Sequence, residues 1–268
     1  IVQTDNPNYS ATDGVLFNKN ATILIEYPCK KQGIYTIPSS VSSIQNSAFW
    51  YCTGLTSIII PNSVTSIEDE TFGYCSGLTN LTLPNSVTSI GSYAFVGCTG
   101  LTSLTIPNSV ISIGSDAFEE CTGLSSVTIP GSVTSIGSYA FYYCTGLISI
   151  TVHSRPIDLS SSSNVFNYVN KSTCILYVPY GTKTLYTSAN QWSDFTNIVE
   201  NAQGFLLSAN TVKLAAANGS NGTVTVTANV TWNASSDQTW LSVSPTSGTG
   251  YTAITLTAQA NQDKMPRT

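Results

Sequence analysis

Five cysteines recur at a fixed interval of 23 residues, and the chemistry open to them depends on how the chain places their sulfur atoms. Thiols can bind zinc, form disulfides or pack as small apolar groups. One cysteine per coil of a repeating fold puts the sulfurs in a line about 4.8 Å apart. Zinc needs four converging ligands, and a disulfide needs Cβ atoms about 3.5–4.5 Å apart with a twisted torsion. We therefore expect no metal, and buried free thiols at Cys52, Cys75, Cys98, Cys121 and Cys144. We expect Cys29 and Cys174 to lie outside this line, with Cys29 as an exposed thiol near Lys30 and Lys31.

Other reactive side chains do not form a known catalytic pattern. The single histidine, His153, lies near several serines and Asp158, but no nucleophile elbow or oxyanion-hole motif accompanies it. Glu70 and Asp116 occupy the same repeat position two coils apart, whereas glycoside hydrolysis needs two carboxylates facing each other across a cleft. The acidic run 68–70 could bind calcium weakly or form a solvated corner. The sequence predicts neither an enzyme nor a cofactor.

The cysteines belong to five repeats of 23 residues that span 38–152. Each repeat keeps a corner residue that is proline in every copy, then Val, Ile, a small residue before Phe, Cys, Gly-Leu and a run of aliphatic residues, as in PNSVTSIGSYAFVGCTGLTSLTI. Two stretches in each copy alternate and are rich in β-branched residues, which favours short strands. A single coil cannot bury its own apolar side chains, so successive coils must stack. The pattern predicts a mostly β solenoid.

The repeat resembles the BspA-like leucine-rich repeat, whose pattern of an I-P corner, a V-x-x-I-G segment, an A-F pair, a Cys and L-x-x-I-x-I recurs in the five copies with a few substitutions, such as T-F for A-F in the second. The resemblance implies parallel β ladders, an origin in a Bacteroidetes-type bacterium and an adhesive role. Residues 13–28 resemble the hairpin that such arrays carry. Residues 172–200 resemble their C-terminal cap, with a last strand, a helix and Trp192, Phe195 and Ile198 closing the core. We divide this part into 1–37 (partial repeat and hairpin), 38–152 (repeats) and 153–203 (degenerate repeat and cap).

From residue 204 the sequence changes to short alternating strands broken by Gly, Asn, Ser and Pro. The stretch TWLSVSPTSGTG resembles the BACON domain, an immunoglobulin-like β-sandwich associated with secreted polysaccharide-handling proteins. We expect residues 204–268 to form such a domain, incomplete by one strand. Trp232 and Trp240 are candidates for stacking on sugar rings, although the alternation around Trp240 favours a core position.

Charge excludes two classes of partner. The formal net charge is -5, and no Lys or Arg occurs from Gln32 to Ser154. Nucleic acids and anionic membranes require clustered cations, so neither is expected as a partner. There is no apolar run of about 20 residues to span a bilayer, and no signal peptide is visible. The abundance of Ser, Thr, Asn and Gly agrees with an extracellular or surface-attached protein, and we expect a monomer.

Differences between the copies show where recognition could occur. Outward strand positions are almost uniformly Ser and Thr, whereas the residues just before the A-F pair and before Cys vary. Exposed aromatic rings with polar neighbours are typical of binding surfaces, although these rings could also merely cover the coil edges. We predict a non-enzymatic binding or adhesion protein whose partner is a protein or glycan on a host or neighbouring cell. The alternatives are carbohydrate or mucin binding through the BACON-like domain, or a structural spacer. The candidate binding residues in the repeats are Trp50, Tyr51, Tyr74, Tyr93, Glu119, Glu120, Tyr139, Tyr142 and Tyr143.

Overall fold

A computed structural model describes residues 2–3, 5–201, 205–207, 212, 214 and 219–259 of the chain. The chain divides into two compact units. The first comprises Ile1–Tyr177 and Leu185–Val199, and the second comprises Val178–Thr184 and Glu200–Thr268. Within the described residues, no helix is both long enough and apolar enough to cross a membrane.

The first unit starts with a small antiparallel sheet that leads into parallel coils. Strands β1 (Tyr9–Thr12), β2 (Val15–Asn18) and β3 (Ile23–Glu26) pair antiparallel, and β3 then pairs in parallel with β5 (Ser43–Ile44). The Asn18 side chain accepts hydrogen bonds from the backbone N–H groups of Thr22 and Ile23, at 2.8 and 2.9 Å. These bonds close the turn between β2 and β3, and the N–H of Ser42 also donates to the Thr22 carbonyl at 2.8 Å.

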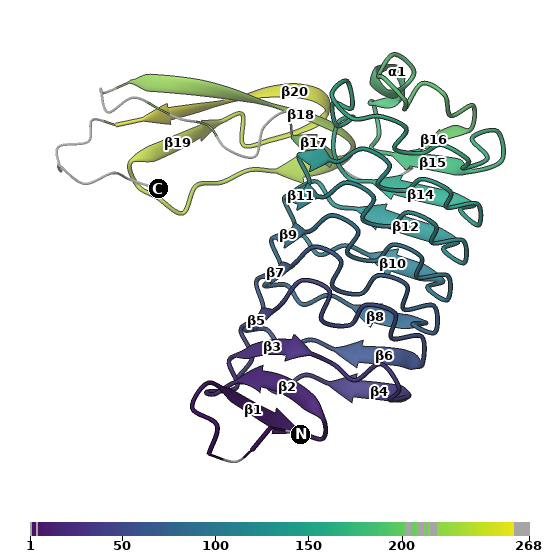
Figure 1. Cartoon of the computed structure of the whole chain (residues 1–268). Helices are drawn as coiled ribbons and strands as arrows, with labels where there is room; N and C mark the ends of the chain where they lie inside the picture. Colours follow the sequence, from purple (N-terminus) through teal and green to yellow (C-terminus); the bar gives the residue numbers. More distant parts are fainter. Residues whose placement is uncertain are drawn as a thin grey trace. The chain divides into compact units, whose positions relative to one another are not determined.

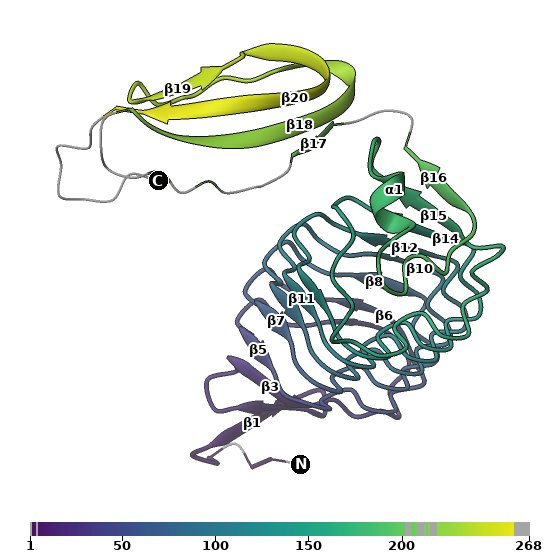
Figure 2. The same ribbon diagram turned by 90° about the horizontal axis from the view of Figure 1, so that it is seen from above.

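Two ladders of parallel strands line the stacked coils that follow. Figures 1 and 2 show one set of strands along one side of the stack and the second set on another side. Because neighbouring strands pair at the repeat interval, equivalent residues lie side by side, as Ser103 and Ser126 do. The first set consists of β4 (Gly33–Thr36), β6 (Leu55–Ile59) and β8 (Asn80–Thr82) in one sheet, and β10 (Ser103–Thr105), β12 (Ser126–Ile129), β14 (Ser149–Val152), β15 (Ile175–Val178) and β16 (Ile198–Glu200) in another. The second set consists of β7 (Ser66–Ile67), β9 (Ser89–Ile90), β11 (Ser112–Ile113) and β13 (Ser135–Ile136).

The core is built from columns of identical residues, one from each coil. Each of these coils contributes one fully buried phenylalanine, and successive rings stack with centroids 5.0–5.7 Å apart. The predicted mostly β solenoid of 23-residue coils is confirmed. The stacked rings are Phe49, Phe72, Phe95, Phe118, Phe141 and Phe166.

The cysteine column follows the prediction in part. Cys75, Cys98, Cys121 and Cys144 are free and buried, and each thiol donates a hydrogen bond of 3.1–3.2 Å to the phenylalanine carbonyl of the preceding coil. Burial raises the pKa of Cys121 to about 12 and acts in the same direction on the others. These thiols are therefore neutral packing groups. Cys174, outside the repeats, is also free and buried.

The prediction was wrong for Cys29 and Cys52, which form a disulfide. Cys29 lies 23 residues before Cys52, so it occupies the cysteine position of the preceding coil and is not outside the column. The two Cα atoms lie 4.1 Å apart, closer than the roughly 4.8 Å spacing that we assumed between strands. The cysteine column thus begins one coil earlier than the uninterrupted repeats.

The last coils are closed by aromatic side chains. Trp192, Phe195 and Ile198 are buried, and the Trp192 indole N–H donates a 2.9 Å hydrogen bond to the Ile157 carbonyl. The expected helix is a single turn, α1 (Lys183–Tyr186), and Trp192 lies beyond it. A turn-rich segment therefore carries the capping rings.

The described part of the second unit contains one antiparallel sheet. Its strand order is β17-β18-β20-β19, and the two long strands β18 and β20 pair over most of their length. Val226, Trp232 and Ile254 form a small apolar cluster on it. The end of the expected BACON-like domain, residues 260–268, lies outside the described residues. The strands are β17 (Phe205–Leu207), β18 (Ser220–Asn233), β19 (Leu241–Ser244) and β20 (Ser247–Ala258).

Candidate binding surface

The variable positions lie on one side of each coil, which we call the turn edge: residues 47–51, 70–74, 93–97, 116–120, 139–143 and 164–168. Two residues of each turn have φ between +55° and +68°. This left-handed region is uncommon for residues other than glycine and costs roughly 1 kcal/mol. The positions are Ser47, Glu70, Tyr93, Asp116, Tyr139 and Asn164 at the first, and Tyr51, Tyr74, Gly97, Glu120, Tyr143 and Tyr168 at the second.

The left-handed residues allow main-chain bonding between coils. In the third repeat, the N–H groups of Tyr93, Phe95 and Gly97 donate to carbonyls of the next coil at 2.8–2.9 Å. Bonds at the same positions recur in the first five turns, so alternate N–H groups of each of these turns point toward the following coil, and the sixth turn supplies accepting carbonyls at Val165 and Asn167. The backbone of the turn edge is therefore held without the variable side chains, which are free to serve another purpose.

An aromatic cluster occupies the first two coils of the turn edge. The rings of Tyr51 and Tyr74 stack 4.7 Å apart, and the Trp50 ring meets Tyr74 edge-on at 5.1 Å. Trp50 covers Gly73 and Tyr74 covers Gly97, where an added Cβ would strike the covering ring. These two rings therefore do cover coil edges. Tyr51 remains 55% exposed.

Carboxylates follow in the fourth coil. The charge of Asp116 raises the pKa of Tyr93, which is 41% exposed, and burial raises the pKa of Asp116 itself. Burial, with the nearby charges of Asp116 and Glu120, raises the pKa of Glu119 to about 7. Glu120 is exposed. Three acidic groups thus share a small area with a tyrosine.

A second aromatic cluster lies on the fifth and sixth coils. The Tyr168 ring contacts Tyr142 and Tyr143, both at 5.1 Å between centroids, and Tyr139 contacts Tyr142 at 5.4 Å. Tyr143 and Tyr168 are 43% and 60% exposed. The sequence prediction missed Tyr168 because its coil lacks the cysteine and the regular spacing. The signal was present, since VFNYV at 165–169 aligns with AFYYC at 140–144.

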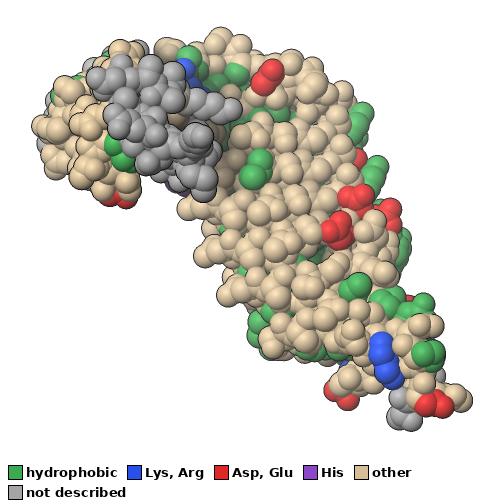
Figure 3. All heavy atoms as spheres, turned by 90° about the vertical axis from the view of Figure 1, so that its left-hand side faces the viewer, with side chains coloured by type: hydrophobic (Ala, Val, Ile, Leu, Met, Phe, Trp, Pro, Cys, Tyr) green, Lys and Arg blue, Asp and Glu red, His purple; other side chains and the backbone are tan. Residues whose placement is uncertain are grey.

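The structure thus brings all the predicted binding residues of the repeats onto the turn edge. Figure 3 shows acidic side chains gathered along one edge of the stacked coils, beside side chains of the class that includes tyrosine. Trp232 belongs to the other unit and is 7% exposed, so its ring does not offer a stacking face to solvent. It is not part of this surface.

The other candidate residues are dispersed. His153 is exposed at a corner of its coil, and no hydrogen bond in the described part of the chain joins its ring to Asp158 or to a serine. The acidic run is already engaged: Asp69 accepts from the Ser92 N–H at 2.6 Å, and Glu70 accepts from the Ser47 hydroxyl at 2.7 Å. These two carboxylates therefore accept hydrogen bonds from different residues.

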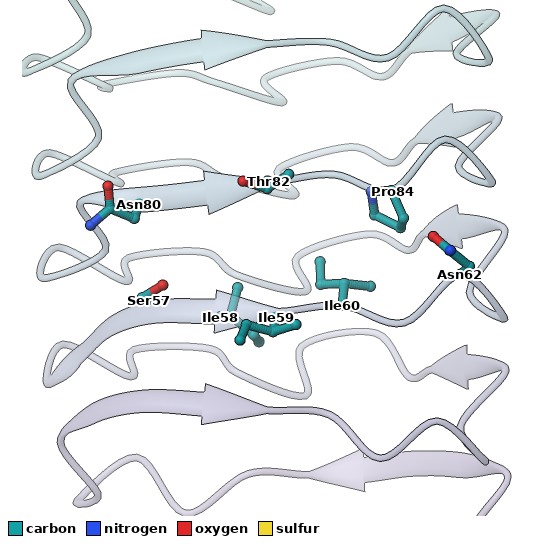
Figure 4. Close-up of a pocket in the computed structure, with 8 residues that line it drawn as sticks. All are labelled: Ser57, Ile58, Ile59, Ile60, Asn62, Asn80, Thr82 and Pro84. Carbon is teal, nitrogen blue, oxygen red and sulfur yellow. The ribbon is translucent and has the colours of Figure 1, made fainter.

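A small hollow of about 260 Å³ lies between two coils on the strand side. Figure 4 shows Asn80 and Thr82 on one strand above Ser57 and Ile59 on the next. None of its lining residues carries an acid, a base or a thiol. The hollow therefore offers shape and hydroxyl groups but no catalytic chemistry. Its lining is Ser57, Ile58, Ile59, Ile60, Asn62, Asn80, Thr82 and Pro84.

The chain belongs to the BspA-type leucine-rich repeat family. The family's description is a BspA type leucine rich repeat region, and its matches cover residues 27–148 and 65–196. Residues 207–268 match a family described as the viral BACON domain. No curated protein matches the chain.

Solved structures of bacterial repeat proteins are similar to the chain. A leucine rich cell surface protein from Faecalibacterium prausnitzii is 36% identical, with a TM-score of 0.53, over 55% of this chain and 40% of its own. A leucine rich repeat protein from T. pallidum is 25% identical, with a TM-score of 0.51, over 63% of this chain and 77% of its own. The pneumococcal vaccine antigen PcpA shares the fold at 23% identity, with a TM-score of 0.60, over 74% of this chain and 49% of its own. The chain therefore spans less than half the length of the F. prausnitzii protein and of PcpA.

Proposed function

We propose that the chain is a non-enzymatic, extracellular or surface-attached binding protein that acts as a monomer and contacts a protein on a host or neighbouring cell through its turn edge. One observation carries this proposal: exposed aromatic rings stand on a backbone that inter-coil hydrogen bonds hold in place. The extracellular location is supported by the likeness to the F. prausnitzii protein, which is described as a cell surface protein.

The physical basis is the burial of preorganised rings. Tyr51, Tyr143 and Tyr168 are each at least two-fifths exposed, and each has a second tyrosine ring against it. Tyrosine has few rotatable bonds, so its immobilisation costs little entropy, and aromatic residues dominate interface hot spots. Truncating one such ring typically costs on the order of 1–2 kcal/mol of binding free energy or more.

The test measures binding of the labelled full chain to intact host epithelial cells by flow cytometry. The variant Tyr51→Asn, Tyr143→Asn, Tyr168→Asn removes the rings, and asparagine tolerates a left-handed backbone. The matched control, Tyr9→Asn with Tyr180→Asn, removes exposed tyrosines outside the turn edge. We expect the triple variant to lose most of the binding and the control to retain it.

Two enzymatic treatments of the cells separate the classes of partner. Protease treatment should abolish binding if the partner is a protein. Binding that survives protease and disappears after glycosidase treatment would favour the carbohydrate alternative and would contradict the proposal. That alternative has lost Trp232 as a stacking candidate, because the residue is buried.

A further inference from the structure

Along the stack, the carboxylates of the fourth coil lie between the two aromatic clusters of the turn edge. This order indicates which chemical groups a partner should carry. Glu119 and Glu120 lie close enough to Tyr74 for their charges to affect its hydroxyl, and Glu119 does the same to Tyr142. The carboxylates therefore lie within electrostatic reach of both aromatic clusters. No Lys or Arg from Gln32 to Ser154 competes for them.

We propose that the turn edge docks an extended, arginine-bearing polypeptide segment, with the guanidinium group at Glu119 and Glu120 and the flanking side chains on the two tyrosine clusters. This inference rests on the proposed function and specifies the partner of the same surface.

Arginine fits this surface better than other groups for chemical reasons. A planar guanidinium pairs with carboxylates through two parallel hydrogen bonds and also stacks on aromatic faces. The lysine ammonium pairs as a point charge without stacking in the same way. Phosphate-rich partners would be repelled by the acidic patch, and neutral sugars would leave its charges without counterions.

The spacing fits an extended chain. Neighbouring coils are separated by about 5.3 Å, as measured between stacked phenylalanine rings. Tyr74 and Tyr143 lie three coils apart, a span of roughly 16 Å, which about five residues of an extended strand would cover. Alternate side chains of such a strand face the same way, so an arginine and the residues two positions before and after it can all point at the turn edge.

The experiment uses the full chain and a blocked nine-residue peptide with arginine at its centre, leucine two positions to either side and serine elsewhere. A second peptide carries citrulline, which keeps the shape of arginine and removes its charge. Surface plasmon resonance at low salt compares their affinities. We expect the arginine peptide to bind at least fivefold more tightly, with the preference decreasing as salt screens the charges.

Two charge-matched variants assign the effect to the site. Glu119→Gln with Glu120→Gln should reduce the preference for arginine to less than twofold. Asp13→Asn with Glu26→Gln, on exposed residues of the N-terminal sheet, also removes two carboxyl groups, which is the same change in formal charge, and should leave the preference intact. Equal affinities of the two peptides for the unmodified chain, or equal effects of the two variants, would overturn the inference. If cell binding still depends on the three tyrosines after such a result, the proposed function holds and only the arginine-bearing partner is excluded.

Discussion

The strand face, formed by the outward residues of the β-strands, and the turn edge are two surfaces of the same coils. They differ in how much their aligned side chains vary from coil to coil. On the strand face the outward columns repeat almost unchanged, with Ser103, Ser126 and Ser149 aligned in one column. On the turn edge the aligned positions change type from coil to coil, from tyrosine to carboxylate and back. Main-chain hydrogen bonds between coils support both surfaces. Individual recognition is therefore expected where the side chains differ, and not where regularity is greatest.

The largest effect should come from the core that both surfaces share. Phe95→Ala removes a fully buried ring stacked between Phe72 and Phe118, and we expect a loss of about 3–5 kcal/mol in unfolding free energy. Chemical denaturation measures it. Thr105→Ala on the exposed strand face is the control and should change stability by less than about 0.5 kcal/mol. Similar values for the two variants would contradict a common core.

An intermediate effect is expected where a turn edge passes into a strand. A Cβ at Gly123 would meet the backbone carbonyls of Thr99 and Leu101, so Gly123→Ala must displace main chain. We expect a loss of about 1–3 kcal/mol. Glu120→Asn, three residues earlier on the turn edge, keeps a residue type that accepts the left-handed backbone. We expect Gly123→Ala to lower the thermal midpoint more than Glu120→Asn does. An unchanged midpoint for Gly123→Ala with a lowered midpoint for Glu120→Asn would contradict this prediction.

The smallest effect should come from the protonation of Glu119 on the turn edge. Burial and the neighbouring carboxylates raise the pKa of Glu119 to about 7, from an ordinary value of 4.5. Between these values the unfolded chain loses the proton while the folded chain keeps it, so unfolding free energy should fall as pH rises from about 4.5 to 7. Because the carboxyl is only partly buried, we expect less than about 1 kcal/mol.

Glu119→Gln isolates this contribution, since it removes the titrating group and keeps the shape of the side chain. Urea denaturation at pH 5 and pH 7.5 gives the difference in unfolding free energy for each protein. The difference should be smaller in the variant than in the unmodified chain. An identical difference in both would mean that Glu119 titrates alike in the folded and unfolded chain.

The sequence predicted the parts of the fold that repeat. Identical residues at a fixed interval identify the buried phenylalanine column and the free thiols from Cys75 onward, because each coil meets the same neighbours. Prediction failed where the interval was hidden or broken. Cys29 precedes the regular repeats, and Tyr168 follows them in a coil with an altered spacing.

The sequence pattern did not predict the left-handed backbone of the turn edge. No glycine or asparagine marks most of these positions, and Tyr93 or Glu120 would ordinarily favour negative φ. Their conformation follows from hydrogen bonds to the next coil, which exist only in the stacked structure. Likewise, Trp232 was predicted as a candidate for stacking on sugar rings, whereas its ring packs on Val226 and Ile254.

The left-handed positions of the turn edge also bear on how such a protein can change. None of them carries Val, Ile or Thr, the residues for which positive φ is most strained, yet they hold serine, carboxylate, amide, glycine and tyrosine side chains. The unbranched residues other than glycine pay a cost of about 1 kcal/mol at such a position, so exchanging one of them for another changes the folding free energy little. The same scaffold can therefore acquire new specificities by exchanging side chains at these positions, and a library varied there with unbranched residues would sample new partners while the core stays constant.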